Sequence, residues 1–129
     1  YLVIDRQWKN GDTVELKLEM PVRVIESDPR VEANAGQIVF ARGPVVFCLE
    51  QEDVDFPVEK ATVSMDLKEV EKQVSVQWHG DLLDGIHILT VPGKVGGRTV
   101  DLKLVPWSVR AGRGQDSRWI IFLPLAGAK

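Results

Sequence analysis

The chain has 129 residues, of which 44% are hydrophobic, with a formal net charge of -3 and a pI of about 5.4. This length suits one domain, and the acidic balance provides no basic surface for nucleic acid or for an anionic membrane. No apolar run approaches the roughly 18 residues of a membrane span. Cys48 is the single cysteine, which excludes an internal disulfide and a zinc site made of four thiolates from this chain.

The N-terminal part carries two strand patterns separated by a turn. Leu2–Trp8 is rich in apolar side chains, and Asn10-Gly11-Asp12 after it is a typical turn sequence. From Thr13 to Val24 the apolar side chains occupy the even positions, which predicts a strand with one buried face. Pro21 has no amide hydrogen, so we expect an edge, a bend or a break there. Because the chain begins inside an apolar segment, we interpret it as a fragment of a larger protein, with residues 1–25 as the tail of a preceding sandwich.

The rest of the chain predicts a series of short strands and one short helix. The strand segments are Gln37–Ala41, Pro44–Leu49, Val74–Trp78, Ile86–Val91, Arg98–Val105 and Trp119–Leu123. Met65–Gln73 is predicted to be helical, because it lacks Gly and Pro and has Asp66 at a capping position three residues before Glu69. Roughly eight strands separated by turn signals predict an all-β fold, an antiparallel β-sandwich or jelly-roll-like module over residues 1–129.

Histidine and carboxylate side chains offer one weak indication of a metal site. His79 and His87 flank the turn that contains Asp81 and Asp84, so the two imidazoles could approach each other beside a carboxylate. Such a set resembles a zinc site. We interpret the histidines instead as polar side chains on strand faces, because no third histidine or fixed spacing motif accompanies them. We therefore predict no metal ligand.

The acidic cluster and the cysteine also have simpler structural interpretations. Glu50, Glu52, Asp53 and Asp55 follow an apolar strand, and we interpret them as a solvated loop rather than a cation site. Cys48 lies inside that apolar strand, where a thiol behaves as a small hydrophobic side chain. No nucleophile motif of the Gly-x-Ser-x-Gly type occurs. We assign no catalytic residue.

Tryptophans are the remaining candidates for a binding function. Trp107 and Trp78, with Arg110 near the former, are the candidate carbohydrate-binding residues, because sugar rings stack on aromatic faces. The alternative is packing in the core or against a neighbouring domain, which we favour because tryptophan is highly buried on average.

Three stretches of the chain resemble the bacterial β-L-arabinofuranosidase-like glycoside hydrolases of family 127. Residues 1–12 are similar to the family's Y-x-x-I-x-R-x-W-x-x-G-D segment, and residues 41–50 to its R-G-P-L-V-Y-C-x-E strand. The third stretch runs from Asp81 to Trp107 and on to Pro124, with Trp107 where the family has Tyr and Ala111 where it has Asn. If those family side chains face a substrate cleft or a domain interface, that contact is altered here.

The resemblance implies a parent enzyme with an α/α-barrel catalytic domain followed by β-sandwich domains. In the family, hydrolysis is attributed to a cysteine nucleophile beside a zinc ion held by further cysteines and a glutamate, all in the barrel. Cys48 matches a strand cysteine of the sandwich and not that nucleophile, so any zinc belongs to the parent's catalytic domain and no cofactor is expected in this chain.

We therefore expect a non-catalytic accessory domain of a bacterial glycoside hydrolase that acts on arabinose-containing plant glycans. Its expected partner is the catalytic domain of its own parent chain, which it packs on and supports. The alternative is a carbohydrate-binding module that holds an oligosaccharide on exposed tryptophans. The expected compartment is the cytoplasm or the periplasm, and the sequence does not decide between them.

Overall fold

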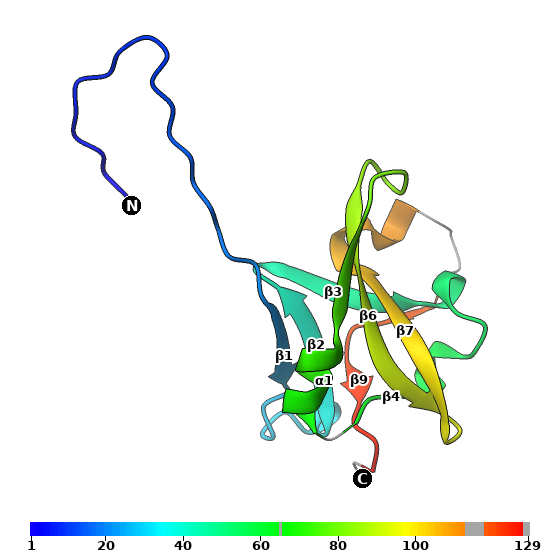
Figure 1. Ribbon diagram of the computed structural model, residues 1–129. Helices are drawn as coiled ribbons and strands as arrows, with labels where there is room; N and C mark the ends of the chain where they lie inside the picture. The colour runs from blue at the N-terminus through cyan, green and yellow to red at the C-terminus, as the bar shows by residue number, and fades with distance from the viewer. Residues whose placement is uncertain (65, 113–117, 128–129) are drawn as a thin grey trace.

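A computed structural model describes residues 1–64, 66–112 and 118–127 of the chain, which form an antiparallel β-sheet body with one short α-helix (Figure 1). The strands are β1 Val22–Glu26, β2 Gln37–Arg42, β3 Val45–Glu50, β4 Ala61–Thr62, β5 Ser75–His79, β6 Ile86–Val95, β7 Arg98–Pro106, β8 Trp119–Ile120 and β9 Leu123–Pro124. Helix α1 spans Leu67–Gln73, and the 3₁₀ turns are η1 Glu32–Asn34, η2 Gln51–Asp53, η3 Val58–Lys60 and η4 Trp107–Gly112.

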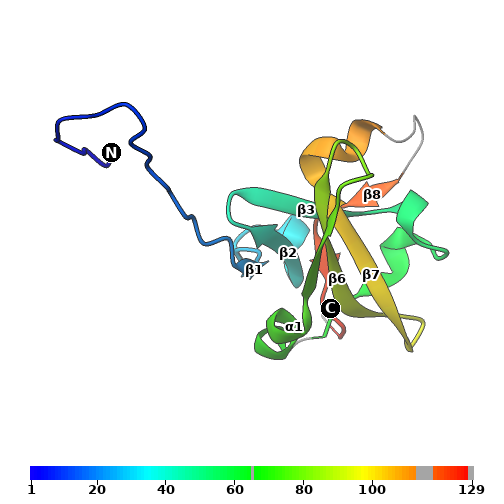
Figure 2. The same ribbon diagram turned by 45° about the horizontal axis from the view of Figure 1, so that its top comes forward.

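Strand β3 connects two curved portions of the sheet, because it changes partner along its length. Its first residues pair with β2 (Ala41 opposite Val46), and its later residues pair with β7 (Cys48 opposite Val105). The strand order is β1-β2-β3-β7-β6-β4, with β5 beside β6, β8 beside β3 and β9 beside β2. The β1–β2 and β6–β7 portions face each other (Figures 1 and 2). This confirms the predicted all-β, sandwich-like fold.

A short parallel β-bridge connects the segment after β4 to the segment after β9, and so joins the two ends of the sheet. Val63, just after β4, pairs with Leu125, just after β9. The Val63 amide donates to the Pro124 carbonyl at 2.9 Å, and the Ala126 amide donates to the Val63 carbonyl at 2.7 Å. Because β9 also pairs with β2, this bridge bends the sheet almost into a ring.

The main core fills the space between the two portions, and side-chain alternation along the strands builds it. Phe47 and Leu49 of β3 point into this core, whereas Cys48 between them points to the opposite face and packs with Ile86 and Val105. Both faces of β3 are therefore covered, as its apolar run predicts. The fully buried part of the main core contains Ile38, Phe40, Leu49, Val58, Ala61, Val63, Leu89, Val91, Leu102 and Leu104.

Local sequence signals explain the helix and the tight turns. Asp66 caps α1, accepting a hydrogen bond from the Glu69 amide at 3.1 Å, as predicted. Met65, where the predicted helical segment begins, lies outside the described residues. Gly96 and Gly97 join β6 to β7 with φ angles of +57° and +82°, which a two-residue hairpin turn of type I′ requires. No helix in the described part of the chain is both long and apolar enough to cross a membrane.

The N-terminal segment differs from the prediction. Residues 1–20 form an extended arm that projects away from the body (Figure 1), and neither Leu2–Trp8 nor the first part of Thr13–Val24 forms a strand. The regular strand begins only after Pro21, at Val22. A strand needs a backbone partner as well as alternating side chains. The described chain offers no strand beside the alternating segment of the arm.

Two other predictions are wrong in detail. Trp119–Leu123 is not one strand, because the chain bends after Ile120 and passes from β3 to β2, where Leu123 pairs with Ile38. Glu50 is not in a solvated loop: β3 continues through it to pair with Trp119, and its side chain is 1% exposed. Glu52 and Asp55 are exposed, as predicted.

Gly93 generates a stability prediction. A Cβ atom at this position of β6 would lie 2.6 Å from Leu102 Cγ and 3.0 Å from the Thr62 backbone oxygen. We expect Gly93→Ala to lower the free energy of unfolding by about 1–3 kcal/mol, because an overpacked core must shift both a buried leucine and β4. Urea unfolding measures this change. Gly80→Ala, in an exposed turn, is the control, and equal effects of the two substitutions would contradict the account.

Candidate functional site

Two of the three segments that carry the family resemblance, residues 41–50 and the stretch that begins at Asp81, converge at one end of the curled sheet. The β2–β3 turn, the turn before β6 and the start of η4 surround a cavity of about 240 Å³, which we call the mouth cavity. Its lining consists of Arg42, Val45, Phe47, Gly85, Ile86, His87, Pro106, Ser108 and Val109. A neighbouring hollow of about 300 Å³ also contacts Val45 and Ser108 and has Trp107 in its wall, so the two hollows adjoin.

Strand alternation places the two basic side chains of the mouth cavity on the inner face of the sheet. Arg42 follows the buried Phe40 by two residues, and His87 precedes the buried Leu89 by two residues. Side chains two residues apart share a face of a strand. Arg42 and His87 therefore extend the inner face beyond the core, where the curled sheet opens to solvent, and Phe47 of the core forms part of the cavity wall.

The surroundings of His87 favour its neutral form. Burial lowers the pKa of the His87 imidazole below its ordinary value, and the positive charge of Arg42 lowers this pKa further. The indole of Trp78 lies opposite in the β5–β6 ladder, with ring centroids 4.9 Å apart and an interplanar angle of 60°. A neutral imidazole held in this way can donate one hydrogen bond and accept another.

The two histidines do not form a shared metal site. His79 is opposite Ile86 in the ladder, and His87 is opposite Trp78. Neighbouring positions of a strand point to opposite faces, so the two imidazoles lie on different sides of the β5–β6 hairpin. Within the described residues, no group of three or more His, Cys, Asp or Glu side chains could hold a metal ion.

Two of the predicted carbohydrate-binding residues lie in one aromatic stack. The Arg110 guanidinium lies 5.4 Å from the ring centroid of Trp107 and 4.0 Å from that of Trp119. Trp119 joins this stack because β8 brings it beside η4, and no local signal in the sequence links it to Arg110. Because the guanidinium is already stacked on these rings, it competes with a sugar for the same aromatic faces.

Trp78 is separate from that stack. Its side chain is 60% exposed, and a Cβ atom added to Gly85 would collide with its indole, so the ring packs closely on the turn before β6. Trp107 is 44% exposed. The structure thus leaves both tryptophans partly open to solvent but on different elements, Trp78 on β5 and Trp107 in η4, where it lines the hollow beside the mouth cavity.

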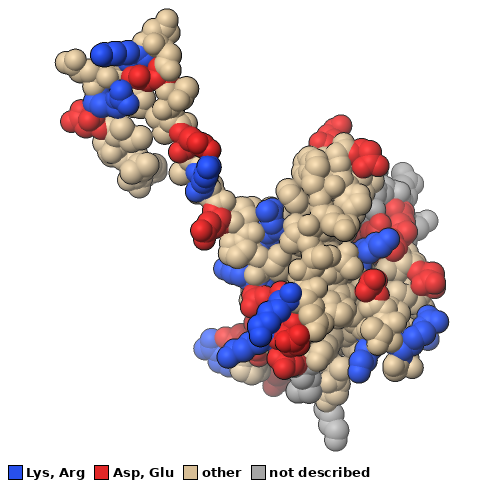
Figure 3. Space-filling model, viewed as in Figure 1, with Lys and Arg blue, Asp and Glu red and all other residues tan. Residues whose placement is uncertain are grey.

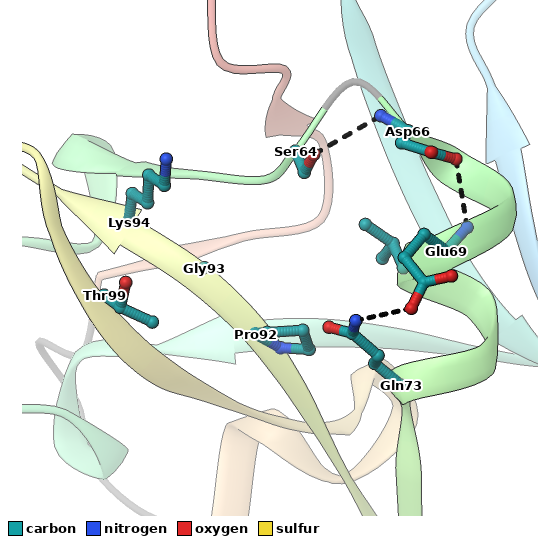
Figure 4. A pocket seen from close by; sticks show the side chains of 9 residues that line it. Ser64, Asp66, Glu69, Gln73, Pro92, Gly93, Lys94 and Thr99 are labelled. Carbon is teal, nitrogen blue, oxygen red and sulfur yellow. Dashed lines mark hydrogen bonds between the residues drawn. The ribbon is translucent and has the colours of Figure 1, made fainter.

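A further hollow of about 200 Å³ lies between α1 and the β6–β7 hairpin (Figure 4). The polar groups of its helical wall bond to one another. Gln73 Nε2 donates to Glu69 Oε1 at 2.7 Å, and the Asp66 amide donates to Ser64 Oγ at 3.4 Å. None of the described residues that line this hollow is aromatic. These residues therefore offer no stacking platform for a sugar.

The surface charges indicate no nucleic-acid interface on the face seen in Figure 3. Acidic and basic side chains are mixed over the body and along the arm (Figure 3). This distribution agrees with the formal net charge of -3 and gives no single basic field that would attract a polyanion.

Comparisons with known proteins point to one family. The family model named "Glycoside hydrolase family 127 C-terminal domain" matches residues 22–124. The non-reducing end β-L-arabinofuranosidase of Bifidobacterium longum subsp. longum is 34% identical over 94 residues, which cover 71% of this chain and 13% of that protein.

Solved structures with a similar fold are also larger proteins. A family 127 β-L-arabinofuranosidase from Geobacillus stearothermophilus T6 superimposes with a TM-score of 0.71 at 23% identity, which shows the fold, over 83% of this chain and 18% of that one. A family 127 β-arabinofuranosidase gives 0.69 at 26% identity, over 91% of this chain and 22% of that one. A third structure, described as a glycoside hydrolase, gives 0.76 at 28% identity, over 95% and 22%. This chain thus spans less than a quarter of each of these proteins.

The environment of His87 predicts a pH-dependent stability. Because the pKa of His87 is lowered in the folded state, the unfolded chain takes up a proton at a higher pH than the folded chain does. The contribution of neutral His87 is complete above the ordinary histidine pKa of about 6.5 and is lost as the pH falls below it. We expect His87→Gln to flatten the dependence of the unfolding free energy on pH between about 7 and 5. His79→Gln, which removes an imidazole from the opposite face, should leave the His87 contribution intact, and equal flattening in both variants would refute this account.

The aromatic stack also generates a prediction. Arg110→Ala should lower the free energy of unfolding by about 0.5–1 kcal/mol per ring contact, because exposed cation–π pairs contribute about that much. It should also change the tryptophan fluorescence, since the guanidinium lies against Trp107 and Trp119. Arg98→Ala, at an exposed position of the β6–β7 hairpin, is the matched control. Unchanged fluorescence in Arg110→Ala would contradict the stack.

Proposed function

The chain belongs to glycoside hydrolase family 127 and carries the C-terminal domain of that family, and from this premise we propose that it is a non-catalytic accessory domain. In this proposal it packs on and supports the α/α-barrel catalytic domain of its parent enzyme, to which the arm connects it through a preceding β-sandwich domain. The parent acts on arabinose-containing glycans, as the β-L-arabinofuranosidase activity in the names of its relatives suggests. The zinc and the cysteine nucleophile of the family belong to the barrel in this proposal.

The observation that carries the proposal is the exposed arm. Val14, Leu16 and Leu18 on its even positions are 58%, 71% and 71% exposed, and Leu2 and Val3 are exposed by more than 80%. Charged side chains occupy the odd positions between the even ones, at Glu15, Lys17 and Glu19. A strand with apolar side chains on one side only is typical of a sheet that has one buried face. This pattern indicates that the arm becomes a strand of such a sheet.

The arm already has the turn of a β-hairpin. The Asp12 amide donates to the Lys9 carbonyl at 3.1 Å, the Lys9 amide donates to Asp12 Oδ2 at 2.8 Å, and Arg6 pairs with Asp12 at 3.0 Å. The segments on both sides of this turn form no strand in the described structure. Their backbone groups are therefore available to extend a neighbouring sheet at its edge.

The solved relatives support this role of the arm. The arm contains 20 of the 129 residues, so a structural match over 95% of the chain must include most of it. Those relatives are several times longer than this chain, and in our proposal the residues that a longer parent adds supply the surface that the arm contacts. In our proposal residues 1–20 form an edge hairpin of a preceding β-rich domain, and residues 21–129 form the accessory domain itself.

The chemistry of the body agrees with a non-catalytic role. The Cys48 thiol is 1% exposed within β3, so no substrate reaches it without opening the sheet. His79 and His87 lie on opposite faces of their hairpin. Hydrolysis of a glycoside generally requires two carboxyl groups, or an equivalent nucleophile and acid, on either side of one bond.

The proposal predicts that the apolar side of the arm mediates association with the preceding part of the parent. When that part is supplied as a separate polypeptide, Leu16→Asp should weaken its binding to this chain by about tenfold or more, because burying one leucine contributes about 1.5–3 kcal/mol. Lys17→Asp, on the polar side of the arm, is the matched control and should bind like the unaltered chain. Isothermal titration measures both. Equal loss in both variants, or no loss in either, would overturn the proposed role of the arm.

The chain alone should not hydrolyse aryl arabinofuranosides or arabinose-containing oligosaccharides, with or without zinc and reductant. The same assay tests the alternative function. Binding of an oligosaccharide without turnover, lost in Trp107→Ala, would identify a carbohydrate-binding module. Turnover that vanishes in Cys48→Ser would show instead that the domain is itself an enzyme.

A further inference from the structure

We infer that the mouth cavity receives a carboxylate group, and that an acidic side chain of the domain that takes up the arm supplies it to Arg42. This inference rests on the proposed function, because it takes the neighbouring domain as the source of the carboxylate. The cavity, its basic side chains and its position beside the arm carry the argument.

Arg42 is a cation on the inner face of the sheet, at the opening of the mouth cavity. It is half-buried in the wall of the cavity, and it makes no hydrogen bond or ion pair within the described part of the chain. Arg23, by contrast, donates to the Gly43 carbonyl at 3.0 Å. A guanidinium that loses water without gaining an acceptor is destabilising, and a carboxylate is the acceptor that matches its forked geometry.

The other groups of the cavity favour an anion with an apolar stem. Ser108 and His87 can each donate a hydrogen bond beside Arg42. Most of the remaining wall is apolar, formed by Val45, Phe47, Ile86, Pro106 and Val109. Among the residues that the structure describes, no acidic side chain lines the cavity, so none of them supplies a counter-charge to Arg42 there.

The size of the cavity admits an amino-acid side chain. Its volume of about 240 Å³ is below the roughly 300–1,000 Å³ of pockets that enclose a small-molecule ligand. An aspartate or glutamate side chain has a short apolar stem and a terminal carboxylate, and it needs no more room than this.

The arm leaves the body immediately beside Arg42. The Met20 side chain packs directly against Gly43, and the Gly43 amide donates to the Pro21 carbonyl at 3.4 Å. The arm therefore projects from the corner of the body where β2 turns into β3 (Figure 1). A domain that binds the arm is held next to the mouth cavity, so its surface can reach Arg42 without a long linker.

The first experiment tests the carboxylate receptor on this chain alone. Acetate and its neutral analogue acetamide are titrated at matched ionic strength, and NMR follows the side-chain signals of Arg42 and His87. We expect acetate to shift both signals and acetamide to shift neither. Arg42→Gln should weaken acetate binding at least fivefold, whereas Arg23→Gln should leave it unchanged. If acetate moves neither signal, or binds equally well to Arg42→Gln, the inference is overturned.

The second experiment identifies the source of the carboxylate. We expect Arg42→Gln to weaken association with the separately supplied preceding domain at least fivefold, with no such change in Arg23→Gln. Glucuronate binding at Arg42 more than tenfold tighter than acetate would show a sugar acid as the ligand and overturn the assignment to a protein side chain. Unchanged association of Arg42→Gln would do the same.

The failures of the two ideas are distinguishable. Loss of the acetate effect refutes the receptor whatever the arm variants do. If Leu16→Asp leaves association unchanged while Arg42→Gln still weakens it, the arm's role in the proposed function fails and the carboxylate contact stands.

Discussion

The fold depends on one strand that belongs to two halves of a sheet. β3 pairs with β2 at its start and with β7 and β8 further along, so it must be covered on both faces and paired on both edges. The apolar run from Val45 to Leu49 meets that constraint, since any polar side chain in it would be buried without a guaranteed partner. The R-G-P sequence before it makes the sharp turn: Gly43 has a φ of +56°, which the first position of a type II′ turn requires.

The longer strands whose partners lie within the chain were predictable. β2, β3, β5, β6 and β7 follow the alternation or the apolar runs of the sequence, and the Asp66 cap located α1. The same alternation predicted strands in the arm that the structure does not have. Periodicity shows which face of a strand could be buried, but it does not show whether a neighbouring strand is present to pair with the backbone. Segments 2–8 and 13–20 were wrong as strands of this structure for that reason.

Other features depend on contacts between distant parts of the chain, which no local pattern encodes. Glu50 is buried because β8 pairs with the end of β3, and Trp119 reaches Arg110 by that same pairing. Arg42 and His87 meet because two strands end at one opening of the sheet. The predicted set of Trp107, Arg110 and Trp78 therefore divides into a stack on η4 and a separate ring on the β5–β6 hairpin, and the cavity between the family-like segments was not predicted.

The bridge between Val63 and Leu125 has a consequence for the order of folding. Residues 123–126 supply both the β9 partner of β2 and the backbone hydrogen bonds that hold Val63 after β4. These residues leave the ribosome after nearly all others of this chain. The β5–β6–β7 meander has short connections and can form early, whereas ring closure joins residues far apart in sequence and is entropically slower. Until closure, the nascent chain exposes one edge of β2 and the apolar faces of Ile38 and Phe40. We infer that this interval is when the domain is most prone to aggregation during synthesis.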